Sequence, residues 1–145
     1  MKILFVCKHN RFRSKVAEAL FRKHNNGRDE VKSAGVRIDL TRPFVAFNVK
    51  KVLLKRGVRI LDEKAREVND FDLEWADRII IVADNVPPGL FRDYGKEIDV
   101  WDVEDADESE ERKIEGIVRD IDYRVKQLVM GLRDERKKSK RVKHL

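Results

Sequence analysis

Cys7, the one cysteine of this 145-residue chain, begins a segment that could bind and attack an oxyanion. Arg13 follows it after five intervening residues, and a hydroxyl residue, Ser14, comes directly afterwards. An apolar run before the cysteine and an amphipathic pattern after it predict a turn from a strand into a helix. Backbone N–H groups and the helix dipole at such a turn favour a bound anion, and a guanidinium can hold two of its oxygens. The segment therefore predicts a phosphate-sized anion site with a thiolate at its floor.

The cysteine count also bears on the cellular compartment. One cysteine cannot form an internal disulfide, which favours the reducing cytoplasm. A lone cysteine is often only a small, inert, buried hydrophobic side chain. The arginine and the hydroxyl that follow Cys7 at this spacing favour the reactive role.

A second group of ionisable residues follows the last predicted strand. Seven of the ten residues from Asp102 to Glu111 are acidic. The carboxyl ends of parallel strands meet at one edge of a sheet, so Asp105 should emerge near Cys7. A carboxylic acid there could protonate a leaving alcohol, although an acidic run is most often the solvated start of a helix. Weaker candidates for the same task are Asp102, Asp107 and Glu108.

Alternating strand and helix patterns predict an α/β domain with a parallel sheet. The predicted strands are Lys2–Val6, Val31–Ala34, Ile79–Val82, which is the clearest central strand, and Glu97–Trp101. One predicted helix follows the Cys7 segment and ends at Asn25-Asn26-Gly27, a second runs from Pro43 to Gly57, and a third from about Glu108 to Arg133. The periodic apolar residues of the last segment mark one long amphipathic helix.

Length and charge exclude some classes of protein. The chain suffices for one domain, 1–145. Of the net charge of +6, residues 133–145 carry +5, from seven Lys/Arg against two acids. A basic tail at about 134–145 can touch nucleic acid, but it is more often a frayed, solvated helix end, so nucleic-acid binding is not expected. No apolar run approaches the roughly 20 residues that span a bilayer, and no residue spacing indicates a metal site.

These features resemble the low-molecular-weight protein-tyrosine phosphatases and the arsenate reductases that share their fold. Four segments in the same order carry the likeness: Val6–Ser14, Ala17–Ala19, Ser33–Gly35 and Trp101–Ala106. The resemblance implies a three-layer α/β/α fold with a four-stranded parallel sheet. It also implies an enzyme without metal or cofactor, and we expect a cytoplasmic monomer.

The resemblance implies hydrolysis of phosphomonoesters, small or protein-bound and phosphotyrosine in particular, through a phosphocysteine intermediate. The residues that it places in catalysis are Cys7, Arg13 and Asp105. Those that it places around the phosphate are Lys8, His9, Asn10, Arg11, Phe12 and Ser14, with Asn10 bracing the loop from within.

Several residues depart from the pattern of the phosphatases. Phe12 stands where a second cysteine is frequent, so a protective disulfide cannot form. His9 replaces a common glycine and resembles the arsenate-reductase branch. Ala106 replaces the proline that usually follows the acid, and no aromatic residue closely follows Asp105 to stack on a substrate ring.

Two other functions compete with a phosphatase. An arsenate reductase would need an external thiol, because Cys7 has no partner cysteine. A phosphate-binding module without catalysis would not need an acid such as Asp105. Arsenate turnover with a thiol donor would identify the first, and failure to hydrolyse any phosphomonoester would favour the second.

Other polar segments near the predicted site admit two interpretations. Ser33-Ala34-Gly35 forms either a tight turn or a backing for the Cys7 segment. Asp84-Asn85 forms a strand-end turn, alone or with hydrogen bonds beneath the site. A basic wall that could attract phosphorylated substrates is expected from Lys8, Arg11, Arg13, Lys15, Arg22 and Lys23, with Arg37 and Arg42 on a facing loop.

Overall fold

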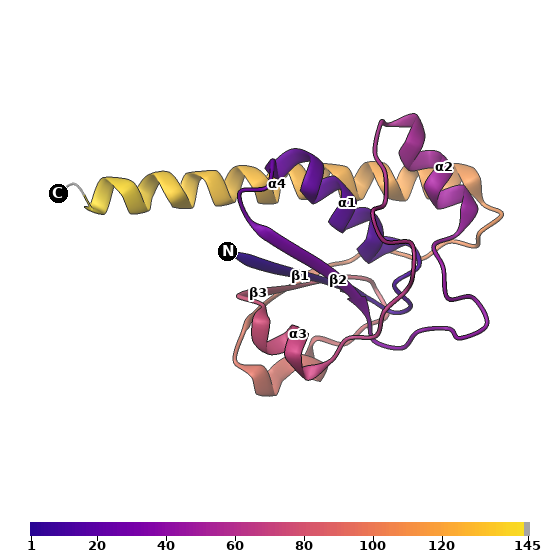
Figure 1. Ribbon diagram of the computed structural model, residues 1–145, viewed down its shortest axis with the longest axis horizontal. Helices are drawn as coiled ribbons and strands as arrows, with labels where there is room; N and C mark the ends of the chain where they lie inside the picture. Colours follow the sequence, from indigo (N-terminus) through magenta and orange to yellow (C-terminus); the bar gives the residue numbers. More distant parts are fainter. Residues whose placement is uncertain (144–145) are drawn as a thin grey trace.

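The computed structural model describes residues 1–143 and is built around a four-stranded parallel sheet (Figure 1). The strand order is β2-β1-β3-β4. The strands are β1 (Lys2–Cys7), β2 (Glu30–Gly35), β3 (Arg78–Val82) and β4 (Glu97–Trp101). Each predicted strand is confirmed, with ends that differ by one residue or less.

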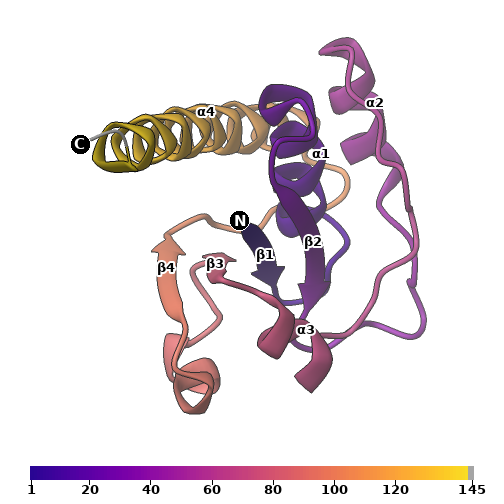
Figure 2. The same ribbon diagram turned by 60° about the vertical axis from the view of Figure 1, so that its left-hand side comes forward.

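Helices cover both faces of the sheet, so the predicted three-layer architecture is confirmed. One face carries α1 (Arg13–Asn25), α2 (Phe47–Lys55) and α4 (Glu111–Lys143), and the other carries α3 (Asp70–Trp75) and the 3-10 helix η1 (Pro88–Tyr94). Figures 1 and 2 show α1 and α4 above the sheet and α3 below it. The short helices α3 and η1 were not predicted from the sequence.

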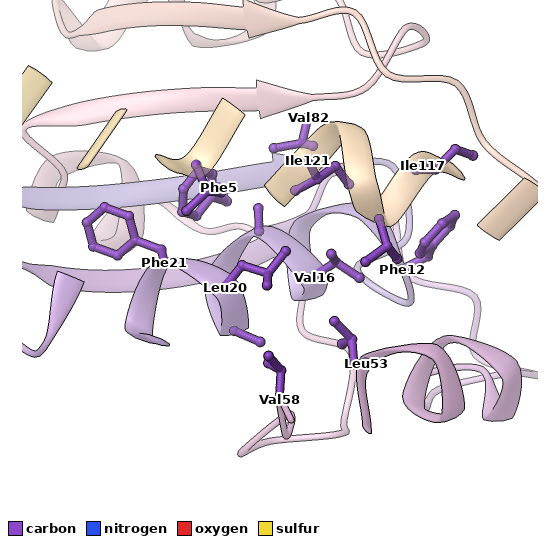
Figure 3. Packing of buried hydrophobic residues seen from close by; sticks show 14 of the residues in the cluster. Phe5, Phe12, Val16, Leu20, Phe21, Leu53, Val58, Val82, Ile117 and Ile121 are labelled. Carbon is purple, nitrogen blue, oxygen red and sulfur yellow. The ribbon is translucent and has the colours of Figure 1, made fainter. Parts of the chain in front are cut away.

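Side chains of the central strands alternate between two apolar clusters. Phe5 of β1 packs with Val16 and Leu20 of α1 and with Ile121 of α4, as Figure 3 shows. Leu4 and Val6 of β1 belong to the second cluster, which includes residues of α3 and η1 on the other face of the sheet. Because both faces of β1 are covered, its residues after Lys2 form an uninterrupted apolar run. This rigid strand fixes the position of Cys7 at its end.

Helix α2 begins four residues later than the prediction from Pro43. Phe44 instead forms an antiparallel bridge with Lys64, and the Val45 N–H donates to the Glu63 carbonyl at 2.9 Å. These contacts hold the chain extended before the helix. Gly57, at a φ of 72°, supplies the predicted stop.

Helix α4 also differs from its prediction, since it begins three residues later and continues ten residues further. Its apolar pattern ends at Leu132 because burial ends there, but the Lys, Arg and Glu residues that follow are good helix formers. Arg136 also pairs with Asp29 at 2.7 Å. The predicted tail is thus helical to Lys143 and extends beyond the sheet in Figure 1, whereas 144 and 145 lie outside the described residues. Fraying of this end stays a prediction. Within residues 1–143, no helix is long and apolar enough to cross a membrane.

Candidate active site

Cys7, Arg13 and Asp105 meet at one edge of the sheet. Cys7 ends β1, and Asp105 lies four residues beyond the end of the parallel strand β4. All three residues line one cavity of about 360 Å³. The parallel topology therefore brings the predicted nucleophile, cation and acid to a common space.

The Cys7 loop, residues 7–14, has backbone N–H groups that are available to bind an anion. Within residues 1–143, the N–H groups of residues 8–13 donate to no protein acceptor. The first turn of α1 that follows contains no acidic residue, so its partial positive charge is not offset. Free N–H groups at the beginning of a helix form a phosphate-binding arrangement.

A buried hydrogen-bond network supports the sulfur of Cys7. Its Sγ lies 2.9 Å from the Ser14 Oγ. Asn10 donates from Nδ2 to that same Oγ at 2.8 Å and to the Ser33 Oγ at 3.1 Å. Because the Ser14 oxygen accepts from Asn10, its own hydrogen is free to point at the sulfur and stabilise a thiolate.

Both ends of this network are anchored in the fold. Ser33 donates from its hydroxyl to Glu18 Oε1 at 2.5 Å, and the Arg66 backbone N–H donates to Asn10 Oδ1 at 3.0 Å. Asn10 is buried and adopts a left-handed φ of 55°, which asparagine tolerates better than most residues. Of the two interpretations of Ser33, backing for the Cys7 loop is the one that holds.

Arg66 also supports the site, although the sequence alone did not predict a role for it. Its guanidinium donates to the Ser33 carbonyl at 2.7 Å and, from Nη2, to both carboxylate oxygens of Asp72 at 2.7 Å each. Asp72 is buried, and the side chain of Asn69 caps the same helix, α3. The pair therefore joins α3 to β2 and holds the backbone that contacts Asn10.

Gly35, the last residue of β2, allows the Cys7 loop to approach closely. A Cβ at this position would lie 2.8 Å from the His9 carbonyl carbon, 2.9 Å from the Asn10 nitrogen and 2.9 Å from the Lys8 oxygen. These atoms belong to the backbone, so only displacement of the loop could relieve the clash.

Gly35→Ala is expected to lower the free energy of unfolding by about 1–3 kcal/mol, as overpacking does, and to lower kcat/KM at least about tenfold by shifting the loop. Gly116→Ala is the matched control, because a Cβ there meets nothing within 4 Å and the helix should gain about 0.5–1 kcal/mol. Chemical denaturation and phosphatase assays on both variants check this. Full activity in Gly35→Ala would contradict the proposed close contact.

The guanidinium of Arg13 is buried beneath the cavity. Its Nη1 donates to the Val103 carbonyl at 2.9 Å and to Asp84 at 3.4 Å, and its Nη2 donates to Asn85 at 3.1 Å. Asp84 and Asn85 thus form hydrogen bonds beneath the site, which decides between their two interpretations. These partners orient Arg13 beside Cys7 before any substrate arrives.

Of the three acidic candidates that line the cavity, Asp105 is the one least held by other side chains. Its side chain is 49% exposed, lies 3.7 Å from Arg13 Nη2, and otherwise accepts the Ala106 N–H at 2.9 Å. Ser109 donates from its side chain and its backbone to Asp107 and holds the pKa of that carboxyl below its usual value. Glu108 is engaged by two arginines, and Asp102 lies outside the lining of this cavity.

Most of the other predicted phosphate-binding residues use their side chains for contacts with other parts of the protein. His9 donates from Nδ1 to the Arg37 carbonyl at 2.7 Å, Arg11 donates from Nε to the Phe44 carbonyl at 2.9 Å, and Phe12 packs in the apolar core. Lys8 is exposed and does not line the cavity. Any contact of residues 8–12 with a phosphate would therefore come chiefly from their backbone.

Five of the eight residues of the predicted basic wall do not line the cavity: Lys8, Lys15, Arg22, Lys23 and Arg37. Lys15 is buried, burial lowers its pKa, and its Nζ donates to the Asp62 carbonyl at 2.7 Å. Arg22 pairs with Glu18, and Lys23 donates to a backbone carbonyl. These residues lie on other faces of α1, so the cations that line the cavity are Arg11, Arg13, Arg42 and Lys113.

Comparison with known proteins identifies the family. A family model described as low molecular weight phosphotyrosine protein phosphatase matches residues 2–139. The chain belongs to this family.

Solved structures agree with the assignment. An arsenate reductase from Archaeoglobus fulgidus is 31% identical, with 88% of this chain and 98% of that chain covered and a TM-score of 0.69. A low molecular weight protein tyrosine phosphatase from T. tengcongensis is 25% identical, with 90% and 99% covered and a TM-score of 0.78. An arginine phosphatase from Geobacillus stearothermophilus is 21% identical, with 94% and 96% covered and a TM-score of 0.80, and shows the fold alone.

The family and its neighbours support a cysteine-based phosphatase. The names of those neighbours include three different activities, so family membership fixes the class of enzyme and leaves the substrate to be argued from the site.

Proposed function

We propose that this member of the low molecular weight phosphatase family hydrolyses phosphomonoesters through a phosphocysteine on Cys7. One observation carries the proposal: the sulfur lies 2.9 Å from the Ser14 hydroxyl, in a loop whose N–H groups at residues 8–13 donate to no backbone acceptor within residues 1–143. A thiolate is the nucleophilic form of cysteine, and both features favour it.

In the first step, the Cys7 thiolate attacks phosphorus while the bond from phosphorus to the ester oxygen breaks. The N–H groups of residues 8–13 and the fork of Arg13 stabilise the equatorial oxygens as charge develops on them. Asp105, protonated, donates its proton to the departing oxygen, so the alcohol leaves neutral.

In the second step, water attacks the phosphocysteine. Asp105, now a carboxylate, takes a proton from that water, and the sulfur leaves as a thiolate. Inorganic phosphate departs and Cys7 returns to its initial state. The three side chains that these steps use, those of Cys7, Arg13 and Asp105, line the same cavity.

An aryl phosphate suits this cavity best, and the proposed substrate is protein phosphotyrosine. Besides its charged residues, the lining of the cavity includes the apolar residues Phe12, Ala46, Val49, Ala106 and Ile114. Such a wall can contact the faces of an aromatic ring, although no aromatic side chain of the Asp105 loop is present to stack on it.

The match to an arsenate reductase at 31% identity supports a second candidate. The Cys7 thiolate would displace one oxygen of arsenate, which leaves as water, and form a sulfur–arsenic bond. An external thiol would then attack the sulfur, the sulfur–arsenic bond would break with its electron pair going to arsenic, and arsenite would leave as a mixed disulfide formed. A second external thiol would then release Cys7. The external thiol is required because the chain has no other cysteine.

Parallel assays on the purified protein separate the two candidates. Hydrolysis of p-nitrophenyl phosphate and of tyrosine-phosphorylated peptides should exceed the reduction of arsenate with glutathione or thioredoxin as the thiol donor. Efficient arsenate reduction with negligible ester hydrolysis would assign the second function, and neither activity would favour a binding module.

Asp105→Asn tests the proposed acid. We expect kcat/KM for phenyl phosphate, whose leaving group needs a proton, to fall by about 10²- to 10⁴-fold. The loss for p-nitrophenyl phosphate should be much smaller, because its leaving group departs readily as an anion. Asp107→Asn is the matched control, since Asp107 lines the same cavity but is held by Ser109. Equal losses for both esters in Asp105→Asn would remove Asp105 from this role.

A further inference from the structure

The Asp105 loop, residues 102–110, joins β4 to α4, and its proposed task requires that it hold Asp105 in a fixed position over Cys7. Ala106 follows the acid, and alanine leaves the backbone freer than proline would. Asp105 itself is half exposed, and its contact with Arg13 is long, at 3.7 Å. Something else must therefore fix the height of this loop above Cys7.

Glu108 supplies contacts from this loop to two other segments. Its Oε1 pairs with Nη1 of Arg11, from the Cys7 loop, and lies 3.3 Å from Nη1 of Arg42, from the segment before α2. Its backbone carbonyl accepts from Asn48 Nδ2 at 2.6 Å. One residue thus joins the Asp105 loop to the Cys7 loop and to α2.

Both arginines that contact Glu108 also contact other groups of the protein. Arg11 is only 14% exposed, and its Nε donates to the Phe44 carbonyl at 2.9 Å. Arg42 pairs with Asp39 at 3.1 Å, and that hydrogen bond raises the pKa of the guanidinium further. Glu108 therefore contacts two cations, the mostly buried Arg11 and the 55% exposed Arg42, and all three residues line the cavity that Asp105 also lines.

We propose that Glu108 is a positioning residue that sets Asp105 over the Cys7 sulfur by binding Arg11 and Arg42. This inference rests on the proposed role of Asp105 as the acid. The clamp, defined as Arg11, Glu108 and Arg42, takes the place of a proline in restraining the loop. The clamp also has an electrostatic consequence. The Glu108 carboxylate neutralises the positive charge of Arg11, so Arg13 is the main cation that faces the phosphate.

A merely structural carboxylate and a positioning carboxylate differ in one measurable respect. Loss of a structural contact lowers activity on every ester alike. A displaced acid slows only those esters whose leaving group needs a proton. The ratio of kcat/KM for phenyl phosphate to that for p-nitrophenyl phosphate isolates this effect, because both substrates carry the same phosphate.

Glu108→Gln keeps the shape of the side chain and removes its charge. Two partly exposed ion pairs are lost, so we expect the phenyl to p-nitrophenyl ratio to fall about three- to tenfold. Arg42→Met should lower the ratio less, and adding it to Glu108→Gln should cause little further loss, since both changes break one cluster. Glu111→Gln is the matched control: it breaks ion pairs of Glu111 with Lys51 and Lys55, outside the Asp105 loop, and should leave the ratio unchanged.

The Asp105→Asn variant in the same assay separates two kinds of failure. If Asp105→Asn lowers the ratio but Glu108→Gln matches Glu111→Gln, the positioning role of Glu108 is overturned and the acid assignment stands. If Asp105→Asn itself leaves the ratio unchanged, the acid assignment fails and the inference fails with it. A fall in the ratio for Glu108→Gln and Asp105→Asn, with none for Glu111→Gln, supports both.

Discussion

Cys7→Ser is expected to lower turnover of p-nitrophenyl phosphate by at least about four orders of magnitude, the scale of loss when a catalytic nucleophile is removed. A serine hydroxyl in this position has nearly the shape of the thiol but is not ionised at neutral pH. The site around it should persist, because Asn10 and Ser14 keep their hydrogen bonds to each other.

Phosphate binding serves as the control for this variant. Cys7→Ser should bind inorganic phosphate within a few-fold of the wild type and unfold at a similar temperature. Activity within tenfold of the wild type would contradict a nucleophilic role for Cys7. Loss of both binding and folding would instead point to collapse of the loop, and Cys7→Ala would then be tested in its place.

Arg13→Lys is expected to lower kcat/KM by about 10²- to 10³-fold, as the loss of one donor to a developing oxyanion typically does. The substitution keeps the positive charge but loses the fork that can hold two phosphate oxygens. It also leaves Asn85 and the Val103 carbonyl with fewer donors beneath the site. Steady-state kinetics and phosphate affinity measure the two effects.

Arg78→Lys is the matched control for Arg13→Lys. Arg78 is 18% exposed, against 2% for Arg13, and pairs with Asp99 at 2.9 Å, but it begins β3, at the end of the strands opposite to Cys7. Both variants should lose a similar amount of stability, and only Arg13→Lys should lose activity. Comparable kinetic losses in the two would assign the effect of Arg13 to folding.

Local patterns in the sequence suffice for the strands and for the position of the Cys7 loop. Covered strands need apolar residues at every position, so β1 and β3 were recognisable without long-range information. Parallel topology then dictates that Cys7 and Asp105 emerge at one edge, since both follow strands of the same sheet. The roles of the individual site residues stay predictions until variants are measured.

Contacts between irregular segments could not be predicted in the same way. Arg66 lies 56 residues from Asn10 along the chain, in a segment without periodicity, and its backbone rather than its side chain makes the contact. Glu108 was one carboxylate among seven, and nothing local distinguishes the one that meets Arg11. Which partners such residues choose depends on how three loops meet in space.

The helix ends illustrate a related limit. Apolar periodicity reports burial, so it marked α4 only as far as Leu132, whereas helix propensity carries the helix to Lys143. At α2 the reverse occurred, because pairing of Phe44 with Lys64 outweighed the helix signal of Pro43. In both places, the apolar pattern reports which side chains are buried, whereas helix propensity and backbone pairing decide where the helix begins or ends.

Mass spectrometry of the rapidly quenched enzyme during turnover tests the central claim most directly. Asp105→Asn should slow the hydrolysis of the intermediate, so this variant is mixed with p-nitrophenyl phosphate and digested after acid quenching. One added phosphoryl group on the peptide that contains Cys7 is the expected result, with none in Cys7→Ala. Steady hydrolysis by the wild type with no phosphoryl group on that peptide in either active protein would contradict attack by the sulfur.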